Sequence, residues 1–311
     1  MLLNSIEGTY NLSFFSIILG TKEDISVAME RNKSTFLHEF VHYLQDLILP
    51  YAIRVNLSNI HWFLNIQQFA ISNGYIKRPF RDWNDDSNLT KQQYLYTMGH
   101  EQFVDNVSDI GAPDISLVEQ EGFDESFSHR QRKFNVYKYC VPVNDGSEIY
   151  HLGARDLLEY IAHKIETRHY PSTDKVSQFP YQSVDLLFEK YGLSYIPGDI
   201  RLCIAECCLY NDNPIHFLFS QFLKNQEHKQ LLAKLYSNYA DVYEFLLSIM
   251  FVTTDNIIEG LSHKRERRLD QFRRTLEINY GYFPEIGAES VIARRRGTTR
   301  GADVGVGAPW T

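Results

Sequence analysis

The chain has 311 residues, a formal net charge of −8 at pH 7, and 44% hydrophobic and 14% aromatic residues. This length allows one large domain or two, and the hydrophobic share excludes a chain that is disordered overall. The negative charge argues against a general nucleic-acid binder, because a phosphate-binding surface usually makes a domain basic. The net charge does not exclude a local basic patch.

The cysteines and the N-terminal apolar run bear on the compartment. Cys203, Cys207 and Cys208 lie in one apolar stretch without C-x-x-C spacing, and free thiols of this kind fit a reducing cytosol. The run from Phe14 to Leu19 follows no lysine or arginine and is too short to span a bilayer. We therefore expect a soluble, cytoplasmic protein without a membrane segment.

The first predicted element is a β-strand over residues 8–19 that ends at Gly20. Residues 34–48 then have apolar side chains at helical spacing, which predicts a largely buried helix. Asn32 or Ser34 is the expected N-cap, and Pro50 ends this helix. Residues 59–71 predict a second helix with one apolar face, formed by Trp62, Phe63, Ile66 and Phe69.

Residues 81–128 are acidic, polar and rich in turn-forming residues. We interpret them as a solvated insertion, and the alternative is a lid or substrate-selecting segment beside a cleft. A β-hairpin follows, with strands over residues 133–143 and 147–152 around the turn Asn144-Asp145-Gly146. Directly after it, residues 154–167 predict a helix.

The remainder of the chain is dominated by helical patterns. Residues 183–280 have helical periodicity that is broken at Gly192, Pro197-Gly198, residues 211–214 and residues 253–255. The sequence thus predicts an α+β fold with a small sheet and a mostly helical C-terminal half. We expect one domain over residues 1–290, with a helical subdomain at 183–290.

Two basic segments lie near the C-terminus. Residues 264–274 combine lysine and arginine with a helical apolar pattern, most simply a solvated helix face that packs through its apolar side. The alternative for this segment is a nucleic-acid interface. Residues 291–311 are rich in glycine and have no periodicity, so we expect a flexible tail.

The most informative motif is His38-Glu39-Phe40-Val41-His42, an HExxH sequence within the first predicted helix. Residues four apart share one helix face, so both imidazoles can point at one metal ion while Glu39 reaches a water bound to it. These polar groups are costly to bury on an apolar helix without partners, and a metal ion supplies one. The alternative is that core hydrogen bonds satisfy both histidines and Glu39 reaches solvent.

A catalytic zinc site usually has three protein ligands and one open position, and the motif supplies two ligands. Glu159 is our candidate for the third, because its helix directly follows a strand and has a buried side marked by Leu158, Ile161, Ala162 and Ile165. Ala162 is small enough to allow close helix approach. Weaker ligand candidates are His100, Glu101, His151, Glu166 and Cys140, the last of which would make a deformylase-like His-His-Cys site.

The motif followed by Tyr43-Leu44-Gln45, together with the later Gly-x-x-x-Leu-x-Glu-x-x-Ala helix at residues 153–162, resembles the gluzincin metallopeptidases and related zincin-like proteins of bacteria and phages. The resemblance is confined to these motifs. It implies a zincin-like fold, Zn²⁺ bound by His38, His42 and Glu159, and activation of water by Glu39.

The chain departs from that family in two respects. The interval between His42 and Glu159 is longer than in the best-known gluzincins. The position four after the glutamate, often an aspartate that supports a zinc-bound histidine, is His163. His163 could support a ligand, compete as a ligand, or lie on the helix surface.

The sequence therefore predicts a zinc-dependent peptidase that acts on a protein or peptide substrate, with Glu39 as general base. The donor that stabilises the oxyanion is open among Tyr150, His151, Arg155, Tyr160 and His163. The alternative is an interaction module with a structural or partner-controlled metal site and a regulatory protein partner. The presence of Glu39 beside a ligand favours catalysis, since a structural site does not need that carboxylate.

Overall fold

The computed structural model describes residues 2–4, 8–11, 16–73, 97–99, 116–127, 130–143, 146–171 and 178–250, with Glu266, Arg267, Asp270 and Arg274 as isolated positions. Several predicted features lie outside these residues: most of the acidic segment, His100, Glu101, the turn residues Asn144 and Asp145, the break at 253–255, most of the basic segment, and the tail at 291–311. In the described part, no helix combines the length and the apolar character that a membrane span requires.

The N-terminal sheet is antiparallel and consists of β1 (Leu2–Asn4), β2 (Gly8–Asn11) and β3 (Ser16–Leu19), in that order. The prediction of one strand over residues 8–19 is wrong, because β2 and β3 pair with each other, with Thr9 opposite Ile18. The residues between them, Leu12-Ser13-Phe14-Phe15, are mostly apolar and include none of the glycine, proline or asparagine that usually marks a turn. The sequence pattern therefore continues across the reversal.

Three helices follow this sheet: α1 (Ile25–Arg31), α2 (Lys33–Ile48) and α3 (Pro50–Asn73). Helix α2 confirms the predicted helix of the HExxH motif. Asn32, one of the two predicted N-cap residues, is the N-cap of α2, but its side chain donates to the Ala28 carbonyl at 2.9 Å and makes no capping hydrogen bond. Helix α3 begins already at Pro50, which suits proline because the first helical position needs no N–H.

The second sheet contains β4 (Ser116–Phe127), β5 (Arg130–Val143) and β6 (Gly146–Leu152), also antiparallel and in that order. Strands β5 and β6 confirm the predicted hairpin, with Tyr137 opposite Leu152. The sequence pattern of residues 81–128 indicates a solvated polar insertion. The last part of this segment, residues 116–127, instead forms strand β4 and pairs with β5. The four acidic residues of β4 are unusual in a strand, so the sequence does not show the usual strand pattern. The backbone of the long strand β5 supplies the hydrogen bonds that hold β4 in the sheet.

The rest of the described chain is helical, as predicted. It comprises α5 (Ala154–His169), α6 (Ser183–Lys190), α7 (Gly198–Cys208), α8 (Pro214–Phe217), the π-helical turn η3 (Leu218–Leu223), α9 (Gln226–Leu235) and α10 (Tyr239–Met250). The predicted breaks at residues 192, 197 and 211–213 fall between these helices, and Gly192 has a positive φ of 73°. The structure thus has an α+β architecture that is rich in helices.

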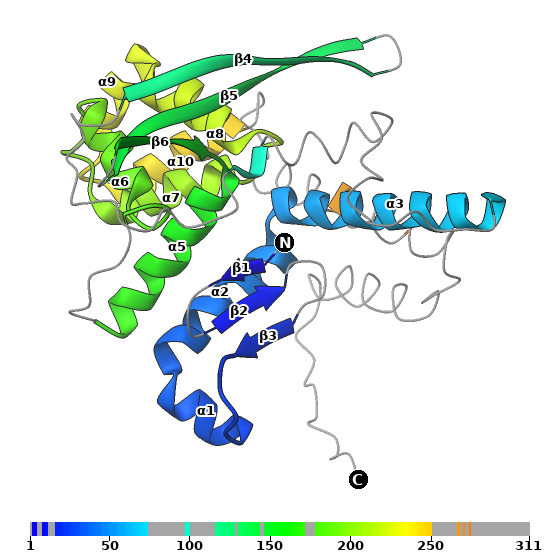
Figure 1. Ribbon diagram of the computed structural model, residues 1–311. Helices are drawn as coiled ribbons and strands as arrows, with labels where there is room; N and C mark the ends of the chain where they lie inside the picture. Colours follow the sequence, from blue (N-terminus) through cyan, green and yellow to red (C-terminus); the bar gives the residue numbers. More distant parts are fainter. Residues whose placement is uncertain are drawn as a thin grey trace, which may run out of the picture.

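Helix α5 holds these parts together. Figure 1 shows it running beside α2, and it also packs on α6 and α7. Of its predicted buried side, Leu158, Ile161 and Ala162 are buried. The first half of α5 is in fact buried on all sides, because Arg155, Asp156 and Glu159 are also at most 2% exposed. Three ionisable side chains in the core require specific partners.

The start of α5 is fixed by Asp156. Its carboxylate accepts from the Gly153 backbone N–H and from the Tyr150 hydroxyl, both at 2.9 Å. A carboxylate in this position satisfies an N–H that has no partner within the helix. Burial raises the pKa of Asp156 to about 7. The same connection, from β6 into α5, lies against the backbone of Met98 and Gly99.

Gly153 is required at this connection because two backbones meet there. A Cβ on Gly153 would lie 2.1 Å from the Met98 carbonyl oxygen and 2.2 Å from the Gly99 nitrogen. We expect Gly153→Ala to lower the free energy of unfolding by about 1–3 kcal/mol, since a backbone cannot move aside as a side chain does. Chemical denaturation measures this change.

Gly198→Ala is the matched control, because a Cβ there meets nothing within 4 Å and the residue lies in the first turn of α7. Its free energy of unfolding should stay within about 0.5 kcal/mol of wild type. Equal stability of the two variants would contradict the close approach at Gly153.

Candidate metal centre

Helices α2 and α5 bring three ligand-type atoms together. His38 Nε2 lies 3.1 Å from both His42 Nε2 and Glu159 Oε2, and His42 Nε2 lies 3.4 Å from the same Oε2. All three residues are buried. Among the side chains that the structure describes, they form the one group of histidine, cysteine or acidic residues able to hold a metal ion together. The arrangement agrees with the predicted ligand set.

The size of this triangle fits a metal ion. Ions such as zinc bind imidazole nitrogen and carboxylate oxygen at about 2.0–2.2 Å, so neighbouring ligand atoms of a tetrahedral site lie about 3.4 Å apart. The three edges of 3.1, 3.1 and 3.4 Å are close to that value. Three protein atoms also leave one tetrahedral position for water or substrate.

Glu166 orients the first histidine. Its Oε2 accepts from His38 Nδ1 at 2.9 Å, and its Oε1 accepts from Ser34 Oγ at 2.6 Å. Glu166 lies about two helical turns after Glu159 on α5, so both carboxylates face α2. The supporting role sought at His163 is therefore taken by Glu166. His163 lies behind it, with Nδ1 at 3.7 Å from Glu166 Oε2.

Gln45 orients the second histidine. Its Nε2 donates to the Leu158 carbonyl at 3.1 Å, which directs its Oε1 to accept from His42 Nδ1 at 2.8 Å. Leu158 immediately precedes Glu159, so the Gln45 amide links the His42 ring to the part of α5 that carries Glu159. Gln45 belongs to the Tyr43-Leu44-Gln45 segment that follows the motif.

These two supports assign the protons of both rings. Each Nδ1 faces an acceptor, so each Nδ1 carries a hydrogen, and in a neutral ring the Nε2 then presents a lone pair. The lone pairs of His38 Nε2 and His42 Nε2 and the carboxylate oxygen of Glu159 converge at about 3 Å. Three acceptors this close repel one another unless a positive charge, either a metal ion or an added proton, lies between them.

The pKa values of the buried groups also show that their surroundings favour positive charge. Burial works against the charged form of His38, but the carboxylates of Glu159 and Glu166 outweigh it and raise its pKa to about 10. Burial likewise opposes ionisation of Glu159, yet His42 and His38 hold its pKa well below the usual range. A metal ion binds neutral imidazole, so it would take the place of this proton.

Glu39 lies on the side of α2 that faces the N-terminal sheet and is 1% exposed. Its side chain packs against Gly8 of β2: a Cβ on Gly8 would lie 3.2 Å from Glu39 Cγ and 3.3 Å from Glu39 Oε1. Strand β2 is held there by Tyr10, whose hydroxyl donates to Asp46 Oδ2 at 2.7 Å. Asp46 also accepts from Asn56 of α3 at 2.6 Å, which joins sheet, α2 and α3.

Sequence reasoning missed Tyr181, which lies beside the site. Its ring meets that of His38 edge-on, with centroids 5.9 Å apart, and its centroid lies 5.0 Å from that of His163. Burial and the carboxylates of Glu159 and Glu166 raise its pKa. No sequence signal marks Tyr181, because it lies in an irregular segment before α6 whose path only the fold determines.

His151 is half-buried on β6 and is not part of the three-residue cluster. Cys140 is on β5, and its side chain lies outside the described part of the molecule. Of the residues considered as oxyanion donors, Tyr150 and Tyr160 donate their hydroxyls at 2.9 Å to Asp156 and Asp185. In this structure, these two hydroxyls are therefore engaged by other carboxylates.

Comparisons of the chain with protein-family models, with curated proteins and with solved structures found no match. The functional interpretation consequently relies on the residues of the site and on the resemblance of their short motifs.

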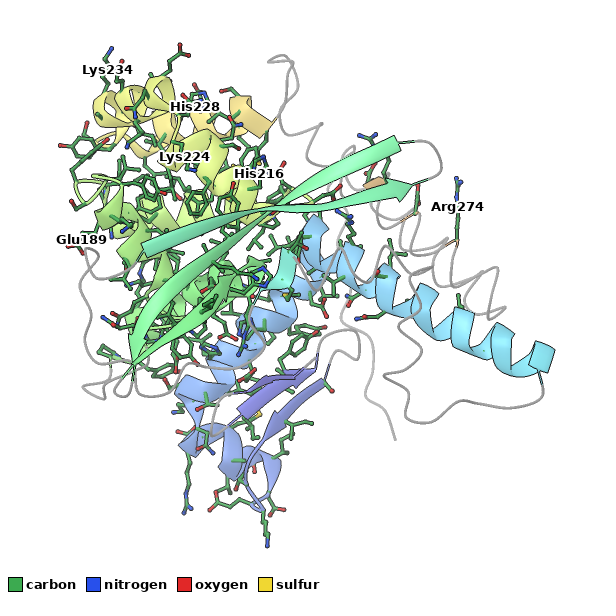
Figure 2. All side chains as sticks on the ribbon, turned by 45° about the horizontal axis from the view of Figure 1, so that its top comes forward. Glu189, His216, Lys224, His228, Lys234 and Arg274 are labelled. Atoms are coloured by element: carbon green, nitrogen blue, oxygen red, sulfur yellow. The ribbon has the colours of Figure 1, made fainter. Side chains whose placement is uncertain are left out.

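Replacing Glu166 tests the metal centre. We expect Glu166→Gln to weaken zinc binding by about tenfold to a hundredfold, because the amide loses the charge that fixes and polarises the His38 ring. Competition with a chromophoric chelator measures the affinity. The control is Glu189→Gln, an exposed carboxylate at the end of α6 and at the margin of the molecule in Figure 2, which should bind zinc as wild type does. Equal affinity in both variants would remove Glu166 from the site.

Proposed function

We propose that this chain is a zinc-dependent metallopeptidase of the gluzincin type with a zincin-like fold. Zinc is held by His38, His42 and Glu159, and Glu39 is the general base. The observation that carries the proposal is the convergence of three buried acceptor atoms, with both histidine Nδ1 atoms held by Glu166 and Gln45. Glu39 is also buried and follows His38 directly in the chain.

The donor set favours zinc among the common divalent ions. Imidazole nitrogen suits zinc and its neighbours, whereas magnesium and calcium prefer sites made of oxygen alone. When bound to three protein ligands, zinc lowers the pKa of its water to about 7 and polarises a carbonyl oxygen.

The residues of the chain supply the remaining chemistry. Glu39 takes the proton of the attacking water and delivers it to the leaving nitrogen of the peptide bond. Tyr181 is the proposed donor to the oxyanion: its raised pKa keeps the phenol protonated at neutral pH, so it can donate a hydrogen bond. Glu166 and Gln45 hold the two imidazoles in the orientation that this chemistry requires.

The proposed substrate is a protein or peptide in an extended conformation. Strand β3 is at an edge of the N-terminal sheet, packs beside α2 and has Ile18 half exposed. An extended peptide can add to such an edge through backbone hydrogen bonds. We also propose a cytoplasmic location, which the free thiols of Cys203, Cys207 and Cys208 support.

A second candidate function is a metal site controlled by a protein partner. An apolar cavity of 310 Å³ lies between α2 and α5, and exposed Phe40, Leu44 and Ile48 contribute to its lining. Gln45 also lines this cavity and hydrogen-bonds His42. A partner that bound there would contact the side chain that orients a metal ligand.

The general base is tested by Glu39→Gln. The amide keeps the shape of the side chain but cannot accept a proton from water, so we expect zinc content to be unchanged and peptide hydrolysis to fall by about a hundredfold or more. Elemental analysis and a library of quenched fluorescent peptides provide the two measurements. A variant as active as wild type would exclude Glu39 as the base. A wild-type protein that binds zinc and cleaves no peptide would favour the partner-controlled site.

The position of Glu39 is tested by Gly8→Ala. The added Cβ would lie 2.6 Å from Thr35 Cγ2 and 3.2 Å from Glu39 Cγ, so the strand or the carboxylate has to shift. Because small misplacements of a catalytic group are costly, we expect turnover to drop by about tenfold to a hundredfold with zinc affinity retained. Gly198→Ala again serves as control. Full turnover in Gly8→Ala would show that the sheet does not position Glu39.

A further inference from the structure

Arg155 is a buried cation next to a proposed metal ligand. It is 2% exposed and is among the largest side chains that are fully buried in the described residues. It precedes Glu159 by four residues on α5, and its Nε lies 3.8 Å from Glu159 Oε1. A guanidinium is charged at every physiological pH, so its burial needs a carboxylate partner.

The two oxygens of Glu159 have different surroundings. Oε2 faces His38 Nε2 at 3.1 Å and His42 Nε2 at 3.4 Å, whereas Oε1 is the oxygen nearest to Arg155. The neighbouring carboxylate of Asp156 already accepts from Tyr150 and from the Gly153 backbone. One oxygen of Glu159 therefore faces the proposed metal site, and the other lies nearest to the Arg155 guanidinium.

This division has a consequence for coordination. A carboxylate can bind a metal ion through one oxygen or through both. If both oxygens of Glu159 bound, the second would occupy the position that a catalytic zinc site keeps for water. A cation that attracts Oε1 away from the metal prevents this.

We propose that Arg155 is a positioning residue that restricts Glu159 to one-oxygen metal coordination and keeps the fourth position of the site open. The inference rests on the metal site of the proposed function and deepens it.

Arg155→Met tests this role, because methionine fills much of the arginine volume without its charge. We expect zinc affinity to change by about tenfold or more, the range that groups supporting metal ligands usually show. The visible absorption bands of the Co²⁺-substituted protein should change, because binding of the second Glu159 oxygen in place of water alters the ligands and the geometry around the ion. Arg155→Lys, which keeps the charge, should resemble wild type more closely in both measurements.

Arg201→Met is the matched control. Arg201 is also partly buried, and its Nη1 donates to Asp185 Oδ1 at 2.7 Å and its Nε to the Ile196 carbonyl at 2.8 Å, away from the metal ligands. This variant should keep the zinc affinity and the Co²⁺ spectrum of wild type. Circular dichroism of each variant establishes folding, and the comparison moves to Arg155→Gln against Arg201→Gln if the methionine variant does not fold.

The outcomes separate this inference from the proposed function. Wild-type affinity and an unchanged Co²⁺ spectrum in folded Arg155→Met, or in Arg155→Gln where that comparison is needed, would overturn the role of Arg155 even if the protein is a peptidase. Altered coordination in a protein that cleaves no peptide would support Arg155 and leave the peptidase proposal contradicted. A wild-type protein that binds neither Zn²⁺ nor Co²⁺ would overturn both.

Discussion

The packing of α2 against α5 is the interaction on which the rest of the site depends. It places His38, His42 and Glu159 so that three acceptor atoms meet in a buried space. Such a meeting is unfavourable by itself, because lone pairs and a carboxylate repel one another where water cannot screen them. Apolar residues of both helices, such as Val41, Leu158 and Ile161, supply the burial that opposes this repulsion. A cation between the three atoms would replace this repulsion with attraction, and the three atoms would then be its ligands.

The groups around the ligands give the site its definition. Glu166 and Gln45 each hold one Nδ1, so both Nε2 atoms are acceptors when the two rings are neutral. Both supports come from the same two helices as the ligands, so ligand and support move together. On the other side of α2, the Tyr10–Asp46–Asn56 hydrogen bonds fix β2 and with it the glycine against which Glu39 packs. The proposed general base is thus positioned by the sheet, and the proposed ligands are positioned by the helices.

Buried charge in the first half of α5 separates this helix from an ordinary core helix. Arg155, Asp156 and Glu159 are fully buried, and each has a distinct partner: the cation lies beside Glu159, Asp156 caps the helix, and Glu159 faces the histidines. Apolar residues at these positions would stabilise the fold at least as well, because buried ion pairs seldom add net stability. Their presence is explained by a function that requires charge at this point, which agrees with a metal site.

The sequence by itself determined the helix of the HExxH motif, the β5–β6 hairpin, the helix that carries Glu159 and the helical C-terminal half, because local periodicity and turn residues specify these elements. It also selected His38 and His42, since spacing along a helix fixes which side chains share a face. It indicated Glu159 through the strand before its helix, the buried side of that helix and the resemblance of its motif to the gluzincins. It did not reveal the reversal between β2 and β3, the strand within the acidic segment, or the parts played by Glu166, Gln45 and Tyr181. Only the tertiary structure decided these, because each depends on which distant segment lies opposite: β5 beside β4, α2 beside α5, and the segment before α6 beside His38. Contacts between segments far apart in the chain leave no periodic pattern in either one.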